Sequence, residues 1–440
     1  MTTAGGRRDG APARHAAAGG GVPWADPGPG DAGVVARTVD ALVVGAGPAG
    51  LAAAARLAAS GAGRVEVLDR ERTAGGIPRH CLHGGFGPRA PFTALTGPGY
   101  ARLLVDEAVR AGAGLRTGIT VTGWAGPRTL ETTGPQGRER VTARVVVLAT
   151  GARERPRAAR LVPGTRPAGV LTTGELQQAV NLHGARVGTR AVVVGTGAIA
   201  AAAVLALTAG GAETVAVVAE DSYRPLPTLR RRIPVLAMTT VTELLGRGRL
   251  SGVRVRHRDG RTATIACDTV VFTGDWIPEH ELARLGGVPL DPGTRGPSVD
   301  TGFHTAVPGV LAAGNLLHGV ERAHVAAAEG RAAAGVALRH LAGAPWPGPG
   351  LPLRTAGPLL WIAPGRIHPH GPAPLHDRFI LRASRPLGLP RLTVTQNGRL
   401  LHRRPVTRPV HPGRPLRLRA GWMADADPDG GELLIEAVPR

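Results

Sequence analysis

An internal repeat is the feature that most constrains the fold of this chain. Residues 41–69 read ALVVGAGPAGLAAAARLAASGAGRVEVLD, and residues 191–219 read AVVVGTGAIAAAAVLALTAGGAETVAVVA, so the two segments align without a gap. Each contains a short apolar run, a glycine turn, an Ala-rich stretch, a Gly-Ala break and a second Val-rich run. This order predicts a βαβ unit that occurs twice.

The second copy also allows a membrane interpretation. Residues 191–212 carry no charge and are long enough to cross a bilayer as a helix. A membrane span would need neither glycines at the turn nor a strand after the helix. The repeat therefore favours a second βαβ unit over a membrane span.

The first glycine turn predicts a dinucleotide site. The turn is a G-x-G-x-x-G sequence formed by Gly45, Ala46, Gly47, Pro48, Ala49 and Gly50. Gly45 allows the tight turn, Gly47 lets a pyrophosphate approach the backbone, and Gly50 lets the helix pack on the strand. The phosphates would then lie at a helix N-terminus, where free N–H groups favour anions. Asp69 ends the next strand and is placed to hydrogen-bond a ribose hydroxyl.

The second turn is a weaker match to the same pattern. Gly195 and Gly197 are present, but Ala200 replaces the third glycine, and Ala219 stands at the register position of Asp69. Glu220 follows, where it could hydrogen-bond a ribose of NAD and disfavour the extra phosphate of NADP. It could equally be the solvated end of a strand, so NAD(H) binding stays open.

Composition excludes several other classes of function. The formal net charge is +21, but the chain contains no Lys and its Arg residues are scattered, with no aromatic-plus-basic RNA motif, so no nucleic-acid partner is expected. The absence of Lys also excludes Schiff-base and P-loop lysine chemistry. Only Cys81 and Cys267 are present, without a C-x-x-C pair, which fits a reducing cytoplasm and predicts no metal site.

Further motifs carry a family resemblance over roughly residues 39–342. A GG segment (residues 70–76, RERTAGG) follows Asp69, residues 145–151 read VVVLATG, and residues 310–315 read VLAAGN. In this order the sequence resembles the FAD- and NAD-linked pyridine nucleotide-disulfide oxidoreductases, the superfamily of glutathione and thioredoxin reductases. The resemblance implies an α/β fold in which an FAD domain is interrupted by an NAD-type domain.

The resemblance also implies which residues bind FAD. Beyond Gly45, Gly47, Pro48, Ala49, Gly50 and Asp69, they are Arg70, Gly75, Gly76, Ala149, Thr150, Gly151, Gly314, Asn315, His324 and Val325. Asn315 stands where the family usually has Asp, which keeps the hydrogen bonding and removes the charge. His324 and Val325 would begin a helix over 322–338 that faces the isoalloxazine ring, where N–H groups stabilise negative charge. A plain packing helix is the alternative.

The expected domain organisation follows from these motifs. We predict a disordered tail over 1–38, an FAD domain over 39–155 and 270–342, and an NAD-type domain over 156–269. Residues 344–352 form a Pro/Gly linker, and 353–440 a small β domain containing a hairpin with a type I′ turn at Asn397-Gly398. Docking of a partner is one hypothesis for this last domain.

One segment indicates a narrower subgroup. Residues 75–87 (GGIPRHCLHGGFG) and 95–101 (LTGPGYA) resemble the flavin subunits of opine oxidase and hydroxyproline dehydrogenase complexes, and a flavoprotein encoded beside anaerobic glycerol-3-phosphate dehydrogenase. Such subunits work with ferredoxin-like or other flavin subunits. The resemblance therefore implies an iron–sulfur or second flavin subunit as a partner.

Four residues are candidates for the chemistry. His80, Cys81 and His83 lie close together in this segment, and His318 follows the late FAD motif. A histidine there could act as an acid or base, or Cys81 could be a buried small residue among loop histidines. Dithiol exchange is not expected, because Cys81 has no partner cysteine nearby and position 86 is Phe86. Cys267 is expected to lie inertly in a strand.

The sequence is compatible with three functions. The first is the flavin subunit of a dehydrogenase that oxidises an amine or 2-hydroxy-type small molecule and passes electrons to a partner. The second is an NADH-dependent reductase that feeds a protein or quinone. The third is a degenerate flavoprotein that serves as an assembly subunit, against which the intact first fingerprint argues.

Overall fold

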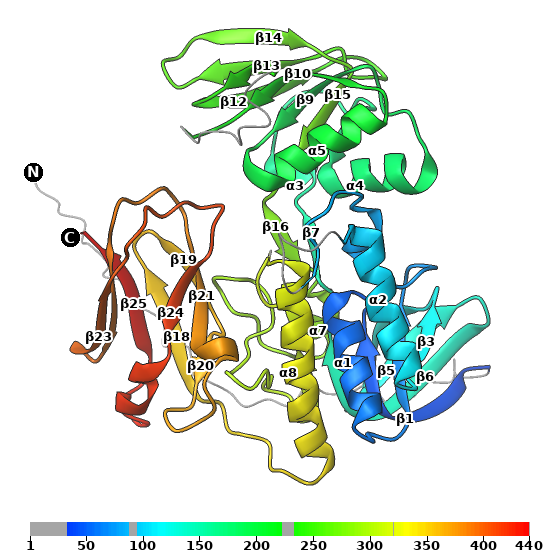
Figure 1. Cartoon of the computed structure of the whole chain (residues 1–440), viewed down its shortest axis with the longest axis vertical. Coiled ribbons are helices and arrows are strands. Elements are labelled where there is room, and N and C mark those ends of the chain that lie inside the picture. The colour runs from blue at the N-terminus through cyan, green and yellow to red at the C-terminus, as the bar shows by residue number, and fades with distance from the viewer. Residues whose placement is uncertain (1–32, 88–94, 222–232, 320, 440) are drawn as a thin grey trace, which may run out of the picture.

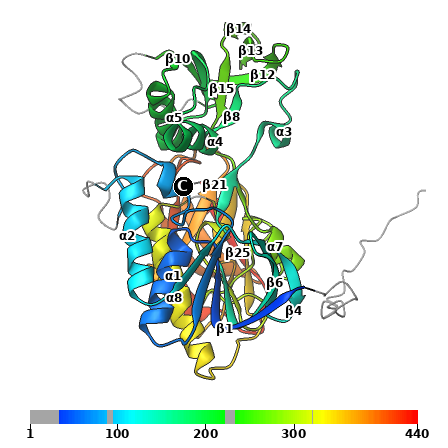
Figure 2. The same ribbon diagram turned by 90° about the vertical axis from the view of Figure 1, so that its right-hand side faces the viewer.

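The protein consists of two α/β units and a C-terminal pair of β-sheets. The computed structural model describes residues 33–87, 95–221, 233–319 and 321–439. Figure 1 shows the α/β unit that contains α1 and α8 in the centre, the unit that contains α5 above it, and the C-terminal sheets on the side of α8 away from α1. Figure 2 shows the narrow connection between the two α/β units.

The first α/β unit is built on a sheet in the order β3-β2-β1-β6-β5-β4, with β17 also paired to β6. Its strands are β1 (Val35–Val44), β2 (Val65–Asp69), β3 (Gly114–Thr117), β4 (Thr120–Gly126), β5 (Thr129–Gly134), β6 (Gly137–Leu148) and β17 (Val310–Ala312). Its main helices are α1 (Pro48–Ala59), α2 (Gly97–Arg110) and α8 (Ala323–Leu341). Because β17 and α8 come late in the chain, this unit is interrupted, as the motif order predicts.

The predicted tail is too long. β1 begins at Val35 and runs parallel to β6, with Val35 opposite Glu139 and Thr38 opposite Thr142. Backbone pairing thus recruits residues 35–38 into the sheet, although their own sequence is not apolar enough to predict it. Residues 1–32, the rest of the predicted tail, lie outside the described residues.

The second α/β unit contains a parallel sheet in the order β11-β10-β9-β15-β8. Its strands are β8 (Val170–Thr172), β9 (Arg190–Val194), β10 (Glu213–Val218), β11 (Val235–Leu236) and β15 (Thr269–Phe272), and its helices are α3 (Arg157–Arg160), α4 (Thr173–Gln177), a π-helical turn (Gln178–Leu182) and α5 (Gly197–Ala209). An antiparallel sheet of β12 (Thr239–Leu245), β13 (Gly252–His257) and β14 (Thr262–Ala266) accompanies it. Cys267 lies between β14 and β15, so its predicted place in a strand is wrong.

The membrane interpretation of the second repeat is also excluded. The turn at Gly195 divides the uncharged segment into the strand β9 and the helix α5. β9 pairs with β10 on one side and with β15 on the other. Across the part of the chain that the structure describes, no helix is long and apolar enough to cross a membrane.

Two short antiparallel strands join the α/β units. β7 (Ala152–Glu154) pairs with β16 (Trp276–Pro278), and α7 (Glu281–Leu285) follows. The buried carboxylate of Glu154 accepts hydrogen bonds from the backbone N–H groups of Gly174 and Gly274, at 2.8 and 2.9 Å. Burial raises the pKa of Glu154, and these hydrogen bonds oppose that rise. The carboxylate therefore ties together both crossings between the units.

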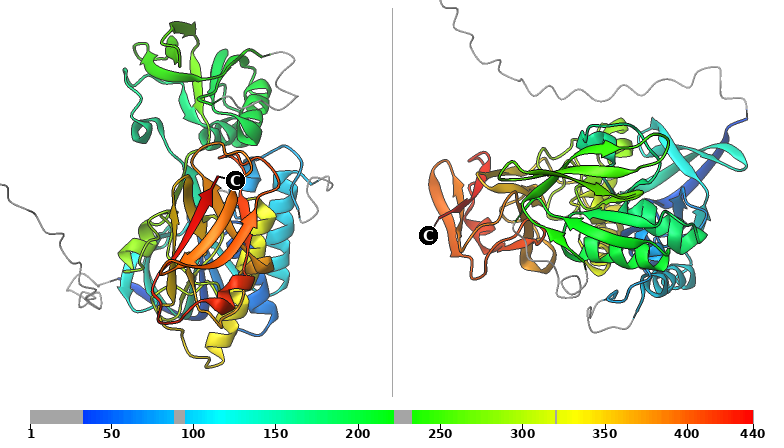
Figure 3. Two further views of the ribbon diagram at one scale, coloured as in Figure 1. Left: turned by 90° about the vertical axis from the view of Figure 1, so that its left-hand side faces the viewer. Right: turned by 90° about the horizontal axis from the view of Figure 1, so that it is seen from above.

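The C-terminal region forms two sheets, in the orders β20-β18-β25-β22-β23 and β19-β21-β24. The strands are β18 (Leu351–Ala356), β19 (Leu359–Ala363), β20 (Arg366–Ile367), β21 (Arg378–Ala383), β22 (Arg391–Gln396), β23 (Arg399–Pro405), β24 (Leu416–Arg419) and β25 (Leu433–Val438). Asn397 and Gly398 both have positive φ, +50° and +79°, which confirms the type I′ turn between β22 and β23. Figure 3 shows these sheets beside the first α/β unit.

Candidate functional site

The first glycine turn is shaped by close backbone contacts. Gly45 has φ +103°, and a Cβ there would lie only 2.5 Å from the carbonyl oxygen of Ala149. A Cβ at Gly50 would overlap the carbonyl oxygen of Gly45. Gly47, by contrast, faces open space, with no atom within 4 Å of a Cβ placed on it. Gly47 is also the N-cap of α1, whose first turn has no side-chain cap, so its N–H groups remain available to an anion.

The GG segment and the acidic residue support this turn. Gly75 donates its N–H to the carbonyl of Ala46 at 2.8 Å, and a Cβ at Gly76 would lie 2.8 Å from the Cα of Gly47. Asp69, at the end of β2, accepts a hydrogen bond from the Ala46 N–H at 2.6 Å. Asp69 therefore lies beside the turn, where the sequence placed it.

The later motifs meet the turn from the other side. Gly314, with φ +78°, would place a Cβ 2.6 Å from the Cβ of Ala49, and a Cβ at Gly330 of α8 would overlap the Ala49 carbonyl. Ala49 is buried against Ala149 and Ala326. Segments far apart in sequence thus converge on one small-residue turn with open space above Gly47. These residues fit a bound dinucleotide such as FAD.

Three other predicted FAD residues already have protein partners. The Thr150 hydroxyl donates to the carbonyl of Glu279 at 2.7 Å, and Arg70 lies 3.4 Å from the Glu279 carboxylate. The side chain of Asn315 both accepts from and donates to the backbone of Glu321, at 3.0 and 3.3 Å. Asn315 thus orders the loop that leads to α8. Gly151 has φ +79° at the start of the crossing to the second unit.

The second turn shares a positive φ at its first glycine with the first turn, but its second glycine, Gly197, has φ +81° where Gly47 has φ −82°. Gly195 has φ +118°, a Cβ there would overlap the Thr273 hydroxyl, and Gly197 has φ +81° with open space around it. Ala200 is fully buried in α5, so the loss of the third glycine is accommodated. The exposed Glu220 lines a hollow that it shares with three cationic or titratable groups, Arg256, His257 and Arg258. Glu220 therefore lies among basic side chains and not alone at the end of β10.

The cluster of His80, Cys81 and His83 is mostly a packed segment. His80 is 3% exposed, neither ring nitrogen has a hydrogen-bond partner among the described residues, and burial lowers its pKa to about 4. Burial, with a contribution from Glu154, raises the pKa of the Cys81 thiol to about 12. Its Sγ contacts the Ile77 carbonyl at 3.4 Å and the Gln177 side chain at 3.5 Å. Because this thiol stays protonated at neutral pH, it is a poor nucleophile there.

His83 is separated from this packing. It is half-buried, its Nδ1 lies 2.9 Å from the Gly84 carbonyl, and its ring lies 5.2 Å from that of Phe86. The three neighbouring candidates therefore differ in exposure and do not form one hydrogen-bonded group.

His318 has a charged partner that sequence reasoning missed. Its Nε2 lies 2.9 Å from Oε1 of Glu329 in α8, while Glu329 Oε2 accepts from the Gly314 N–H at 3.1 Å. Burial alone would lower the pKa of His318, but the charge and hydrogen bond of Glu329 outweigh it, so that the pKa is raised. Glu329 is the only acidic residue in the Ala-rich helix α8. A lone acidic residue in an apolar helix is the sequence signal that could have identified this partner.

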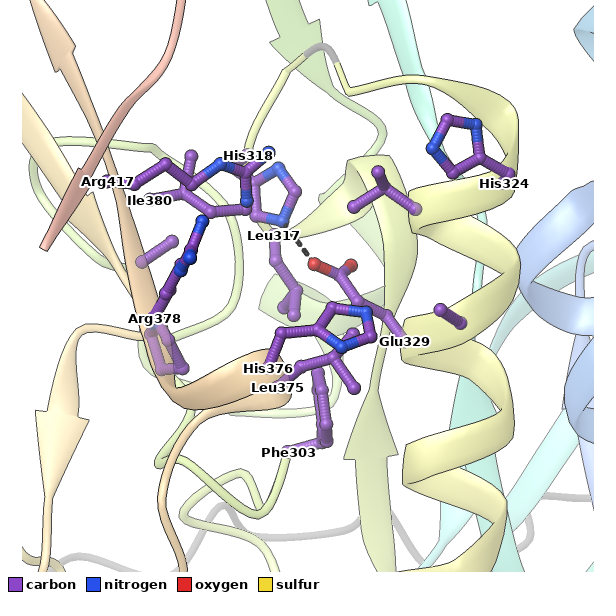
Figure 4. Close-up of a pocket in the computed structure, with 14 residues that line it drawn as sticks. Phe303, Leu317, His318, His324, Glu329, Leu375, His376, Arg378, Ile380 and Arg417 are labelled. Atoms are coloured by element: carbon purple, nitrogen blue, oxygen red, sulfur yellow. Dashed lines mark hydrogen bonds and ion pairs between the residues drawn. The ribbon is translucent and has the colours of Figure 1, made fainter. Parts of the chain in front are cut away.

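His318 and His324 line a cavity of about 500 Å³ between α8 and the C-terminal sheets. Figure 4 shows His324 and Glu329 on α8, with His318 between Glu329 and the side chains of Arg378 and Arg417. His324 and Val325 lie in the first turn of α8, where the sequence predicted them, and burial lowers the pKa of His324. The predicted helix is confirmed with bounds shifted toward the C-terminus.

Comparison with known proteins places this arrangement among flavin enzymes. A family model described as pyridine nucleotide-disulphide oxidoreductase matches residues 39–330. A ferredoxin–NADP reductase from Ignicoccus hospitalis is 28% identical over 70% of this chain and 99% of that protein. A subunit of opine oxidase from Agrobacterium tumefaciens is 37% identical over 36% of this chain, but only 32% of that protein is covered.

A solved structure agrees with these sequence matches. Thioredoxin reductase from T. acidophilum superposes with a TM-score of 0.58 and 26% identity, over 69% of this chain and 99% of that one. The part of the chain that this match leaves out is about as long as the predicted tail and the C-terminal sheets together.

Proposed function

The chain belongs to the pyridine nucleotide-disulphide oxidoreductase family and is a flavin oxidoreductase, and from that premise we propose that it is the FAD subunit of a dehydrogenase. Its substrate would be an amine or 2-hydroxy-type small molecule, and its electrons would pass to a partner subunit. It is not a disulfide reductase, because its two cysteines, Cys81 and Cys267, are both free and lie in different α/β units. We also propose that it works in the cytoplasm, as its cysteine content suggests.

The convergence of small residues on Ala49 carries the proposal. Gly45, Gly47 and Gly50 would hold the pyrophosphate at the N-terminus of α1, and Asp69 would meet the adenosine ribose. The motif residues Gly75, Gly76, Ala149, Thr150, Gly151, Gly314 and Asn315 would complete the FAD site. When bound, FAD supplies a two-electron acceptor. The start of α8 has no side-chain cap, and the N–H of Val325 donates to the Arg322 carbonyl, so the N–H of His324 is the one that would be directed at negative charge.

An anaerobic visible spectrum of the purified chain, with FAD supplied, tests the proposal. We expect a bound flavin band that candidate amines or 2-hydroxy acids bleach. If no band appears after FAD is supplied, the proposed function is wrong.

A substitution at Gly47 sharpens this test. A Cβ at Gly47 meets no protein atom within 4 Å, and Gly47→Leu needs no unusual backbone, since φ at Gly47 is −82°. The variant should therefore fold but fill the space proposed for the pyrophosphate, and so lose the flavin band. Gly413→Leu, also in open space but in the C-terminal region, is the matched control and should keep the band.

A second candidate is an NADH-dependent reductase that feeds a protein or quinone. The open space at Gly197 favours it, and so does the similarity to a ferredoxin–NADP reductase over nearly that protein's whole length. NADH should then bleach the flavin band without any other substrate. A flavin band that neither NADH nor any small molecule bleaches would instead favour an assembly subunit.

The electron acceptor is proposed from a relative that is itself part of a larger enzyme. The opine oxidase relative is named as one subunit of that enzyme, and the match covers a third of its length. We propose an iron–sulfur or second flavin subunit as the electron acceptor. Copurification with such a subunit from the native source, with electron transfer to it after bleaching, is the measurement.

A further inference from the structure

The cavity between α8 and the C-terminal sheets shares His324 and Val325 with the proposed FAD site, but the rest of its lining has no role there. It is about 500 Å³ in volume and is lined by residues from two parts of the chain (Figure 4). The charged and titratable groups in its lining are His318, His324, Glu329, His376, Arg378 and Arg417. A cavity of this size suits a small molecule.

One face of the β21–β24 ladder presents arginines to this cavity. Phe379 and Leu381 of β21 are fully buried in the C-terminal core, so Arg378, Ile380 and Arg382 lie on the opposite face of the strand. Arg417 of β24 stands directly opposite Ile380 in the antiparallel pairing. Residues opposite one another share a face, so Arg417 lies beside Arg378 and Arg382.

These guanidinium groups exceed the carboxylates that face them. Glu321 lies 3.2 Å from Arg417 and 3.8 Å from Arg382, and so is shared by both. Arg378 forms no ion pair within the described ranges 33–87, 95–221, 233–319 and 321–439. Glu329 is already bound to His318 and to the Gly314 N–H. The cavity therefore carries an uncompensated positive charge.

His318 supplies an independent indication of a ligand. Its side chain is 2% exposed, and its Nδ1 has no hydrogen-bond partner among the described residues, although Nε2 is bound to Glu329. A buried polar atom without a partner is costly, and such atoms are rare in folded proteins. Because His318 lines the cavity, a polar group of a bound molecule would satisfy Nδ1.

We propose that this cavity binds a small carboxylate-bearing molecule. Arg378 and Arg417 receive the carboxylate through their planar guanidinium forks, and Nδ1 of His318 exchanges a hydrogen bond with an amine or hydroxyl of the same molecule. Of the two arginines in the described cavity lining, Arg378 is the one without an ion pair, so a singly charged ligand matches it better than a phosphate dianion does. The assignment of this ligand as the substrate rests on the proposed function; the binding itself does not.

Titration calorimetry on the full chain with FAD supplied tests the proposal. The probes are L-lactate and L-alanine. L-Lactamide is the analogue of lactate that lacks the carboxylate, and inorganic phosphate is the competing anion. We expect both acids to bind, and lactamide and phosphate to bind at least about tenfold more weakly. Arg378→Gln should weaken binding of the acids about tenfold, whereas Arg403→Gln, on the exposed strand β23, should leave it unchanged.

A second variant keeps the proposal testable without altering a charge. Ala328 lines the cavity from α8, so Ala328→Phe should fill the space and abolish binding of both acids. The proposal is overturned by equal affinity for lactate and lactamide, by tighter binding of phosphate, by no binding of either acid at millimolar concentration, or by unchanged binding in Arg378→Gln. Unchanged binding in Ala328→Phe would overturn it as well.

The visible spectrum separates this failure from failure of the proposed function. A flavin band that small molecules bleach, together with no calorimetric preference for acids, would remove the carboxylate site and leave the oxidoreductase proposal intact. Acid binding that depends on Arg378, in a chain that binds no FAD, would remove the proposed function and leave the site.

Discussion

The two buried histidines in the part of the chain that the structure describes have opposite electrostatic surroundings. His80, 3% exposed, has no hydrogen-bond partner for either ring nitrogen among the described residues, and burial lowers its pKa to about 4. His318, 2% exposed, is bound to the carboxylate of Glu329, and its pKa is raised despite its burial. The difference shows that burial alone does not make a histidine chemically useful at neutral pH. The ring needs a fixed partner, and it also needs space in which a ligand can reach it.

The largest expected effect comes from removing the partner of His318. Glu329→Ala leaves His318 buried without its carboxylate and the Gly314 N–H without its acceptor, so the free energy of unfolding should fall by about 3–5 kcal/mol. Urea denaturation measures this loss. The control is Glu432→Ala, which removes an exposed pair with Arg354 and should cost no more than about 1 kcal/mol. Equal losses in the two variants would contradict the assigned role of Glu329.

The next effect is acid sensitivity caused by His80. Its folded-state pKa of about 4 lies below the ordinary value of 6.5, so the unfolded chain binds the proton first. Stability is then fully present above pH 6.5 and falls as the pH drops toward 4, by about 3 kcal/mol in total. The measurement is the free energy of unfolding in urea across this range. His80→Gln should flatten this part of the profile, and an unchanged slope in the variant would show that other groups cause it.

His318 should act with the opposite sign and a smaller effect, because burial opposes the influence of Glu329. Its pKa is raised in the folded state, so its contribution to stability is fully present below pH 6.5 and is lost as the pH rises through the folded-state pKa. Unfolding free energies measured from pH 6.5 upward should therefore decline in the native chain. They should decline less in His318→Gln, and the idea fails if the two slopes agree.

The smallest expected effect concerns Cys81. Its thiol has a pKa raised to about 12, mainly by burial, so almost none of it is thiolate at pH 8. Iodoacetamide should label Cys81 in the folded chain far more slowly than in urea, and Cys81→Ala should leave bleaching of the flavin band unchanged. Rapid labelling of the folded chain, or loss of bleaching in the variant, would restore Cys81 as a candidate for the chemistry.

Local sequence was sufficient for the parts of the fold that depend on glycine and on strand periodicity. Gly45 and Gly195 have positive φ and leave no room for a Cβ, so a glycine at each position indicates the turn geometry. The order of the motifs predicted that β17 and α8 would return to the first sheet, and the pairing of β17 with β6 agrees. The Asn397-Gly398 turn was likewise readable, because both positions require φ above zero.

Only the tertiary structure decided which side chains meet. His80 and Cys81 are neighbours in sequence and both are buried, with Cys81 packed against Gln177. His318, in contrast, pairs with Glu329, which α8 brings to it. The arginine face of β21 and β24 arises from an antiparallel register that no local pattern specifies. Side-chain chemistry depends on contacts between distant segments, and those contacts are set by the packing of the whole chain rather than by any single motif.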